Sequence, residues 1–138
     1  MRRGLRIEDL GDLLELPILA VLGLHRPDGT IMLSPVWHEW RDRGFNVWVS
    51  PDAPGKIRLI ERDPRVTAVV AEDAVPNRAI EVRGIATVSR DGFRELIRRT
   101  ARRYVGADGA DAFAESMPAD GYVIRLEPGE IRAWDYDD

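Results

Sequence analysis

The chain has 138 residues, of which 44% are hydrophobic and 32% charged, a composition typical of one globular domain with a substantial core. Its net charge of −4, from 24 acidic and 20 basic residues, argues against a bulk attraction to nucleic acid or to an anionic membrane. The absence of cysteine excludes disulfides, thiolate metal sites and cysteine nucleophiles.

Neither a metal site nor a membrane segment is expected. The only histidines, His25 and His38, are too few for a typical zinc site without well-placed carboxylates. Residues 1–10 turn from basic to acidic without the apolar core of a signal peptide, and the longest apolar run, residues 17–24, is too short to cross a bilayer. We therefore expect a cytoplasmic protein with a single domain over residues 1–138.

The first predicted element is a helix over residues 7–15. Leu10, Leu13 and Leu14 form one apolar stripe, and Pro17 ends the element.

Three strands are predicted next, over residues 18–24, 31–40 and 45–50. Gly29 lies in the turn between the first two and is free to adopt positive φ. Residues 41–44 form the second turn, so the second and third strands are expected to pair as a hairpin.

A helix over residues 55–63 follows a segment rich in proline and glycine, and Pro64 ends it. Two further strands are predicted over residues 65–72 and 78–89. Gly84, in the middle of the second, indicates a bulge or a close backbone contact.

Asp91 is predicted to cap a helix whose apolar positions recur at helical spacing from Phe93 to Tyr104. A shorter helix over residues 106–117 and a final strand pair, or one bent strand, over residues 121–136 complete the chain. Hairpins dominate this order and no βαβ series occurs. The fold class is therefore predicted as mainly β (α+β), a small antiparallel barrel with peripheral helices.

Lys56 is a candidate anion-binding residue because it directly follows a Pro-Gly pair at a predicted helix start. Backbone amides and the helix dipole favour an anion there, and the ammonium group adds a charge. Ser50 can contribute a hydroxyl from the end of the preceding strand. The alternative is an ordinary solvated lysine after a turn.

The segment "PVWHEW" offers aromatic candidates. Trp37 and Trp40 fall on opposite faces of a strand, so at most one belongs to the core. Pro35 suits an edge strand or a bulge, where free amides could meet the polar rim of a ring system. The alternative is that Trp37 fills the barrel. His38 is expected at the surface or at an interface.

The helix from Phe93 also carries a run of arginines, which form either a solvated face or a contact for an acidic ligand tail or partner. These are Arg94, Arg98, Arg99, Arg102 and Arg103.

The segments "SPVWHEW", "GKIRLIERDPRV", "VPNRAIEVRGIATV" and "YVIRLEPGEIRAWDY" together resemble the split β-barrel flavin and deazaflavin oxidoreductases. These form the pyridoxamine 5′-phosphate oxidase-like superfamily, and the resemblance is to its actinobacterial branch that uses coenzyme F-420. It covers nearly the whole chain. It implies a homodimer with two cofactor sites at the subunit interface.

The resemblance also implies roles for single residues. The family's lysine in this motif holds the cofactor phosphate, a role that falls to Lys56. Arg58 matches the basic residue two positions on, Ser50 a hydroxyl position at the strand end, and Arg78 the arginine of the proline-containing loop.

Pro35, Val36 and Trp37 match the segment whose backbone runs along the isoalloxazine-like ring. The chain departs from the family at Pro54, where a serine is common, at Leu59, where an asparagine is common, and at Asn77, where the loop usually has an aromatic residue.

The expected function is therefore a coenzyme F-420-dependent oxidoreductase that transfers hydride between the deazaflavin and a small unsaturated substrate. No side chain is assigned as a catalytic acid or base. The alternatives are an FMN-binding oxidase or reductase and a non-catalytic cofactor- or haem-binding module.

Overall fold

The computed structural model describes residues 1–137 as seven strands, three α-helices and two short 3-10 helices. The strands are β1 (Ala20–His25), β2 (Ile31–Val36), β3 (Glu39–Arg41), β4 (Gly44–Val49), β5 (Arg65–Ala71), β6 (Ala79–Ser89) and β7 (Tyr122–Trp134). The helices are η1 (Ile7–Leu10), η2 (Leu13–Glu15), α1 (Gly55–Arg62), α2 (Phe93–Val105) and α3 (Ala107–Ser116).

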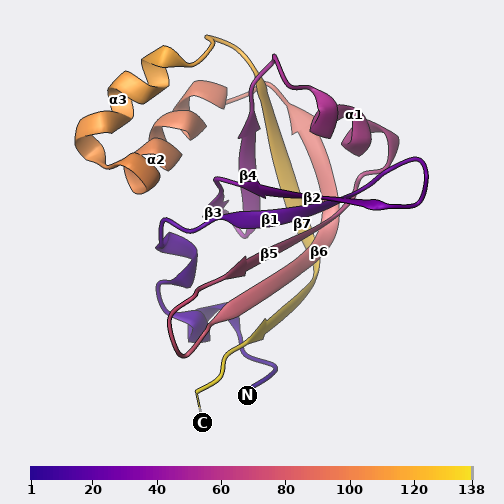
Figure 1. Ribbon diagram of the computed structural model, residues 1–138, viewed down its shortest axis with the longest axis vertical. Helices are drawn as coiled ribbons and strands as arrows, with labels where there is room; N and C mark the ends of the chain where they lie inside the picture. Colours follow the sequence, from indigo (N-terminus) through magenta and orange to yellow (C-terminus); the bar gives the residue numbers. More distant parts are fainter. Residues whose placement is uncertain (138) are drawn as a thin grey trace.

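The strands form one antiparallel sheet in the order β2-β1-β5-β6-β7-β4-β3. Its two edge strands, β2 and β3, are neighbours along the chain and are separated only by Trp37 and His38. The sheet must therefore curl until its edges approach each other (Figure 1). The result is a split β-barrel with peripheral helices, which confirms the predicted fold class.

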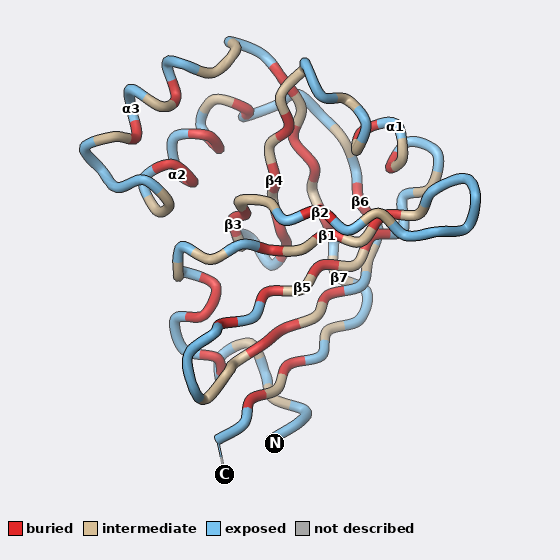
Figure 2. Tube along the Cα trace, viewed as in Figure 1, coloured by how far each residue is buried: buried red, intermediate tan, exposed pale blue. Residues whose placement is uncertain are grey.

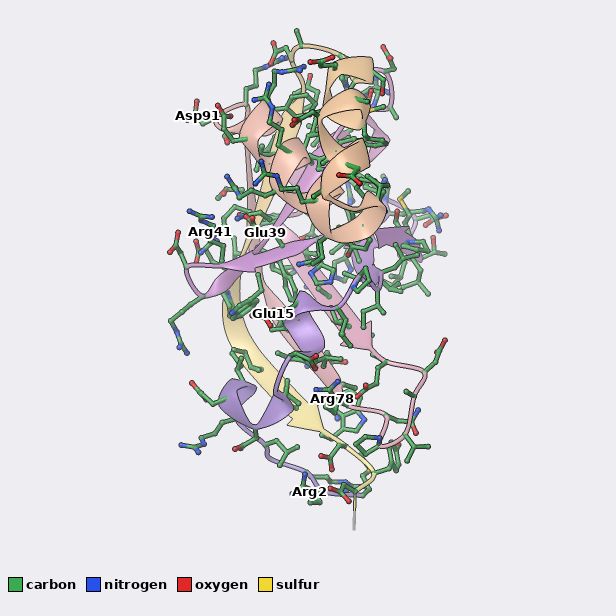
Figure 3. The ribbon with its side chains drawn as sticks, turned by 90° about the vertical axis from the view of Figure 1, so that its left-hand side faces the viewer. Arg2, Glu15, Glu39, Arg41, Arg78 and Asp91 are labelled. Carbon is green, nitrogen blue, oxygen red and sulfur yellow. The ribbon has the colours of Figure 1, made fainter. Side chains whose placement is uncertain are left out.

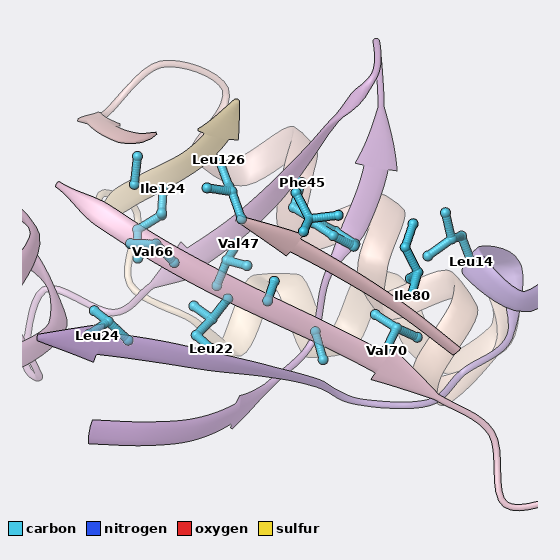
Figure 4. Close-up of a cluster of buried hydrophobic side chains, with 14 of the residues drawn as sticks. Leu14, Leu22, Leu24, Phe45, Val47, Val66, Val70, Ile80, Ile124 and Leu126 are labelled. Carbon is cyan, nitrogen blue, oxygen red and sulfur yellow. The ribbon is translucent and has the colours of Figure 1, made fainter. Parts of the chain in front are cut away.

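The barrel core is made by the inward face of each strand, because side chains alternate between the two faces of a sheet (Figure 2). Leu22, Val70, Ile80, Phe45 and Leu126 are among the buried side chains that meet there from five different strands (Figure 4).

Three helices cover parts of this sheet. Ile57 and Ile60 of α1 enter the barrel core. α2 and α3 pack side by side on the outside of β4 and β7, where they form a second apolar cluster (Figure 1). Its buried members are Phe93, Leu96, Ile97, Ala114 and Val123. No helix within residues 1–137 is long and apolar enough to cross a membrane.

The prediction of a single helix over residues 7–15 is wrong, although the leucines of this segment are buried as expected. The structure has η1 and η2 instead, separated by Gly11, whose φ of 57° and ψ of −124° interrupt helical geometry.

Two other boundaries also differ from the prediction. The strand predicted over residues 31–40 breaks at Trp37 and His38, where the chain passes from one sheet edge to the other. Asp91 does not cap α2: the cap position is Gly92, with a φ of 73° and no capping side-chain hydrogen bond.

The bulge predicted at Gly84 is confirmed by a register shift between β6 and β7. A β-carbon at this position would overlap the carbonyl oxygen of Glu127, so the close backbone approach requires glycine. The final segment is one strand, β7, and not a pair.

Candidate functional site

The start of α1 has the features of an anion site. The chain leaves β4 at Ser50 and turns, with the amide of Ala53 donating to the Ser50 carbonyl at 3.2 Å and the amide of Asp52 donating to Ser50 Oγ at 3.3 Å. No side chain among residues 1–137 caps the helix, whose cap residue is Pro54, and its first turn contains no acidic residue. The amides of the first turn are therefore free to bind an anion.

Lys56 and Arg58 extend from this first turn. Lys56 is half-buried and Arg58 is exposed, and neither side chain has an ion-pair or hydrogen-bond partner among residues 1–137. Ser50 accepts one hydrogen bond, so its own hydroxyl proton remains available to a ligand. Two unpaired cations beside uncapped amides form a local positive site on a chain whose net charge is negative.

Arg78 is not brought to this site within one chain. It lies at the far end of β5 from α1, in the half of the molecule that carries Arg2 (Figure 3). Its guanidinium donates hydrogen bonds to both carboxylate oxygens of Glu72. It also donates to Asp12 Oδ1 at 2.8 Å and to the Leu10 carbonyl at 2.7 Å. The contact with Arg78 lowers the pKa of Glu72. Through these hydrogen bonds, Arg78 links the end of η1 to the loop before β6.

Trp37 lies outside the barrel, in an aromatic cluster with Trp48, Tyr104 and Phe113. Its ring stacks on Tyr104 with centroids 4.8 Å apart and an interplanar angle of 1°. Trp48 and Phe113 lie 6.1 Å and 4.9 Å from it. The alternative that Trp37 fills the barrel is therefore wrong. Trp40 packs against the barrel core instead, 4.9 Å from Phe45.

His38 is fully buried, which corrects the expectation of a surface or interface residue. The break after Val36 turns the His38 ring inward, between Phe45 and Tyr104. Neither ring nitrogen has a hydrogen-bond partner among the residues that the structure describes. Burial, together with the charge of Arg103, lowers the pKa of His38 to about 3, so the imidazole is neutral near pH 7.

Three of the five arginines on α2 make hydrogen bonds or ion pairs with other parts of the protein. The arginines therefore do not form a simple solvated face of the helix. Arg94 donates to the carbonyls of Ala114 and Pro118, Arg99 pairs with Glu39, and Arg103 donates to the carbonyls of Leu14 and His38. Arg98 and Arg102 are exposed and have no side-chain partner among the described residues. These two, one helical turn apart, remain available to an acidic ligand or partner.

Two hollows lie on the opposite side of the sheet from the core. The outer sheet face of β2, β1, β5 and β6 carries a groove of about 460 Å³, which continues into one of about 760 Å³. The smaller groove is lined by Val21, Gly23, His25, Ile31, Leu33, Thr67, Val69 and Glu81. Leu33 is 70% exposed there. The sequence predicted no such surface, although the alternate apolar residues of β1 and β2 were a signal for it.

No family model matches the sequence, and no curated protein is significantly similar to it. Solved structures do match. A conserved hypothetical protein from Mycobacterium tuberculosis superposes with a TM-score of 0.79 at 19% identity, over 96% of this chain and 86% of that chain. A protein described as an F-420 reductase gives a TM-score of 0.68 at 26% identity, over 87% of this chain and 93% of its own.

A haem storage protein from Vibrio cholerae also matches, with a TM-score of 0.70 at 16% identity over 94% of each chain. The protein therefore shares the split β-barrel fold of these solved structures, which include a protein described as an F-420 reductase and a haem storage protein.

Proposed function

We propose that the protein is a coenzyme F-420-dependent oxidoreductase acting on a small unsaturated organic compound. The observation that carries the proposal is the unpaired Lys56 at the uncapped start of α1, where a cofactor phosphate would find both a cation and free amides. The similarity to an F-420 reductase, at 26% identity over most of both chains, supports the choice of cofactor.

The residues present fit such a cofactor. Lys56, Arg58 and the hydroxyl of Ser50 would hold the phosphate. Pro35 and Val36 end the edge strand β2 and Trp37 follows it, and the backbone of an edge strand is free on one side to meet a ring system. When bound, the deazaflavin would supply the hydride chemistry, and the protein would supply position and electrostatics.

The acidic tail of coenzyme F-420 distinguishes it from FMN, which ends at its phosphate. Arg58 beside the phosphate site, and Arg98 and Arg102 on α2, are exposed cations without partners among residues 1–137. They favour a ligand that carries carboxylates beyond its phosphate. Haem is less well supported, because His38 is buried and only His25 offers an accessible imidazole among the described residues.

The proposal includes a homodimer in which a second copy covers the outer sheet face. That face exposes several apolar side chains on edge strand β2 and its neighbours, and a two-fold partner would shield both the apolar surface and the strand edge.

The function is tested by titrating the purified protein with coenzyme F-420, FMN and haem, each followed by its absorbance. We expect coenzyme F-420 to bind more tightly than FMN, and added salt to weaken it. Binding of haem or FMN in preference to coenzyme F-420, or of none of the three, would contradict the proposal.

A further inference from the structure

A hollow of about 280 Å³ lies at the end of the molecule where the chain begins and ends, far from α1 (Figure 1). Arg3, Gly4 and Leu5 line it on one side and residues 131–134 of β7 on the other, and we name it the terminal pocket. We propose that the terminal pocket binds a small organic anion that carries one carboxylate on a compact apolar body.

The N-terminal wall of the terminal pocket is fixed to β7 at two points. Arg2 and Asp135 exchange two backbone hydrogen bonds, of 2.8 and 3.1 Å, and the Arg2 guanidinium donates to both Asp135 carboxylate oxygens at 2.9 and 2.6 Å. This contact lowers the pKa of the buried Asp135 carboxyl, so the ion pair persists near pH 7. The second point is the Leu5 amide, which donates to the Ala133 carbonyl at 3.1 Å. The wall is therefore an ordered part of the fold.

Between these two points the segment bends away from β7. Arg3 and Gly4 stand opposite the single residue Trp134, so two residues face one as in a β-bulge. Gly4 has a φ of 67°, a conformation that favours glycine. The bend separates the backbone from β7 and opens the terminal pocket between two anchored stretches. The pocket is thus built into the fold before any ligand arrives.

The walls of the terminal pocket are mainly apolar. Leu5 and Ile131 pack against the barrel core, Ala133 is buried, and Trp134 contributes its ring. Such walls favour a ligand with apolar surface over a bare inorganic ion, which would gain nothing from them. The volume lies just below the range of roughly 300–1,000 Å³ for ligand pockets, which suits a body of about six carbon atoms.

One cation beside these apolar walls has no counter-charge. Arg132 lies over the Trp134 ring, 4.9 Å from its centroid, and its charge is balanced by Glu81 at 3.2 Å. Arg3 is exposed and has neither an ion-pair nor a hydrogen-bond partner among residues 1–137. Its guanidinium can therefore bind a carboxylate at the mouth of the terminal pocket while the apolar body lies inside.

The terminal pocket shares no residue with the proposed cofactor site, so the inference goes beyond the proposed function and does not rest on it. The test is a nuclear magnetic resonance titration of the ¹⁵N-labelled protein with cyclohexanecarboxylate, its neutral amide cyclohexanecarboxamide, and acetate. We expect cyclohexanecarboxylate to shift the Gly4 amide and the Trp134 indole N–H saturably, with one site per protomer. The amide lacks the charge and acetate lacks the apolar body, so each should bind at least about tenfold more weakly.

Arg3→Gln removes the charge from the mouth of the terminal pocket and should weaken cyclohexanecarboxylate binding about tenfold. Arg43→Gln is the matched control, because Arg43 is an exposed arginine in the turn between β3 and β4 and also has no partner among the described residues. It should leave binding unchanged.

The inference is overturned if cyclohexanecarboxylate gives no saturable shifts at Gly4 and Trp134, or if the amide or acetate binds equally well. It is also overturned if folded Arg3→Gln binds like the wild type, or if Arg43→Gln weakens binding as much. Coenzyme F-420 enters none of these measurements, so failure of the inference and failure of the proposed function are separate results.

Discussion

The buried imidazole of His38 makes one residue sensitive to pH. Burial first, and then the neighbouring charge of Arg103, lowers its pKa to about 3 in the folded protein, whereas an unfolded chain binds this proton near pH 6.5. Protonation therefore favours the unfolded state. The stability that depends on neutral His38 is complete above pH 6.5 and is lost as the pH falls towards 3.

We predict that the free energy of unfolding falls by about 2 kcal/mol when the pH is lowered from 7 to 5, because His38 is protonated only in the unfolded chain. The loss is about 1.36 kcal/mol per unit of pH below 6.5. Urea unfolding at the two pH values measures the loss. His38→Leu replaces the imidazole with an apolar side chain of similar size that cannot be protonated. Its free energy of unfolding should change little over this window, because carboxylates such as Asp63 have lowered pKa values and titrate below it. An equal loss in both proteins would mean that His38 is solvated.

Single residues show what the sequence could and could not predict about the candidate site. The helix start at residue 55 and its basic first turn followed from local signals, namely the Pro-Gly pair and Lys56. The engagement of Arg78 with Asp12 could not be predicted, because it depends on a contact between segments 66 residues apart in the chain. The burial of His38 was missed because strand alternation fails where β2 ends.

At the scale of elements, the long pairing of β6 and β7 depends on the bulge at Gly84. We predict that Gly84→Ala lowers the free energy of unfolding by at least about 2 kcal/mol, because the new β-carbon would overlap the Glu127 carbonyl and force the strands apart. Chemical denaturation of the variant measures this loss.

Gly109→Ala is the matched control for this prediction. Gly109 lies within α3, where an added β-carbon would meet only Val105 Cγ2 at 3.7 Å, an ordinary contact. Alanine should stabilise the helix by up to about 1 kcal/mol. If both substitutions change stability alike, the bulge does not require glycine.

Elements with a clear and uninterrupted period were predicted well from the sequence, and elements broken by a backbone turn were not. The alternation of β6 and the apolar spacing of α2 placed both within about two residues of their observed bounds, which is the usual uncertainty of element ends. The η1 and η2 helices were merged because three leucines at helical spacing outweighed Gly11. The break between β2 and β3 was missed because it is imposed by the curl of the whole sheet.

For the whole molecule, the exposed apolar side chains of the outer sheet face lead us to expect self-association. Leu33 is 70% exposed beside an apolar groove, which is an unusual position for a large apolar side chain on a strand. We predict that light scattering gives twice the monomer mass at micromolar concentration, and that Leu33→Glu gives the monomer mass by placing a charge in the interface.

Val105→Glu is the control for assembly, because Val105 is 44% exposed at the end of α2, away from the outer sheet face. It should leave the dimer intact. A wild-type protein that remains monomeric, or equal dissociation of both variants, would refute the proposed interface.

The class of fold was predictable from the order of hairpins, but the order of strands was not. The pairs β1–β2 and β3–β4 are joined by short turns and follow from the local sequence. The pairs β1–β5 and β4–β7 join distant segments. Their choice depends on which apolar faces can close one core, a property of the complete chain.

The affinity of Lys56→Ala for coenzyme F-420, compared with that of Arg62→Ala, tests the central claim most directly. Arg62 lies in the last turn of the same helix, so its loss removes the same charge away from the helix start. A charge-assisted contact with a phosphate contributes about 1.5–3 kcal/mol. Titration calorimetry should therefore show a roughly ten- to hundredfold loss for Lys56→Ala, with stability changed by no more than about 0.5 kcal/mol, and little loss for Arg62→Ala. Unchanged binding by folded Lys56→Ala, or an equal loss in both variants, would contradict the assignment of the start of α1 as the cofactor phosphate site.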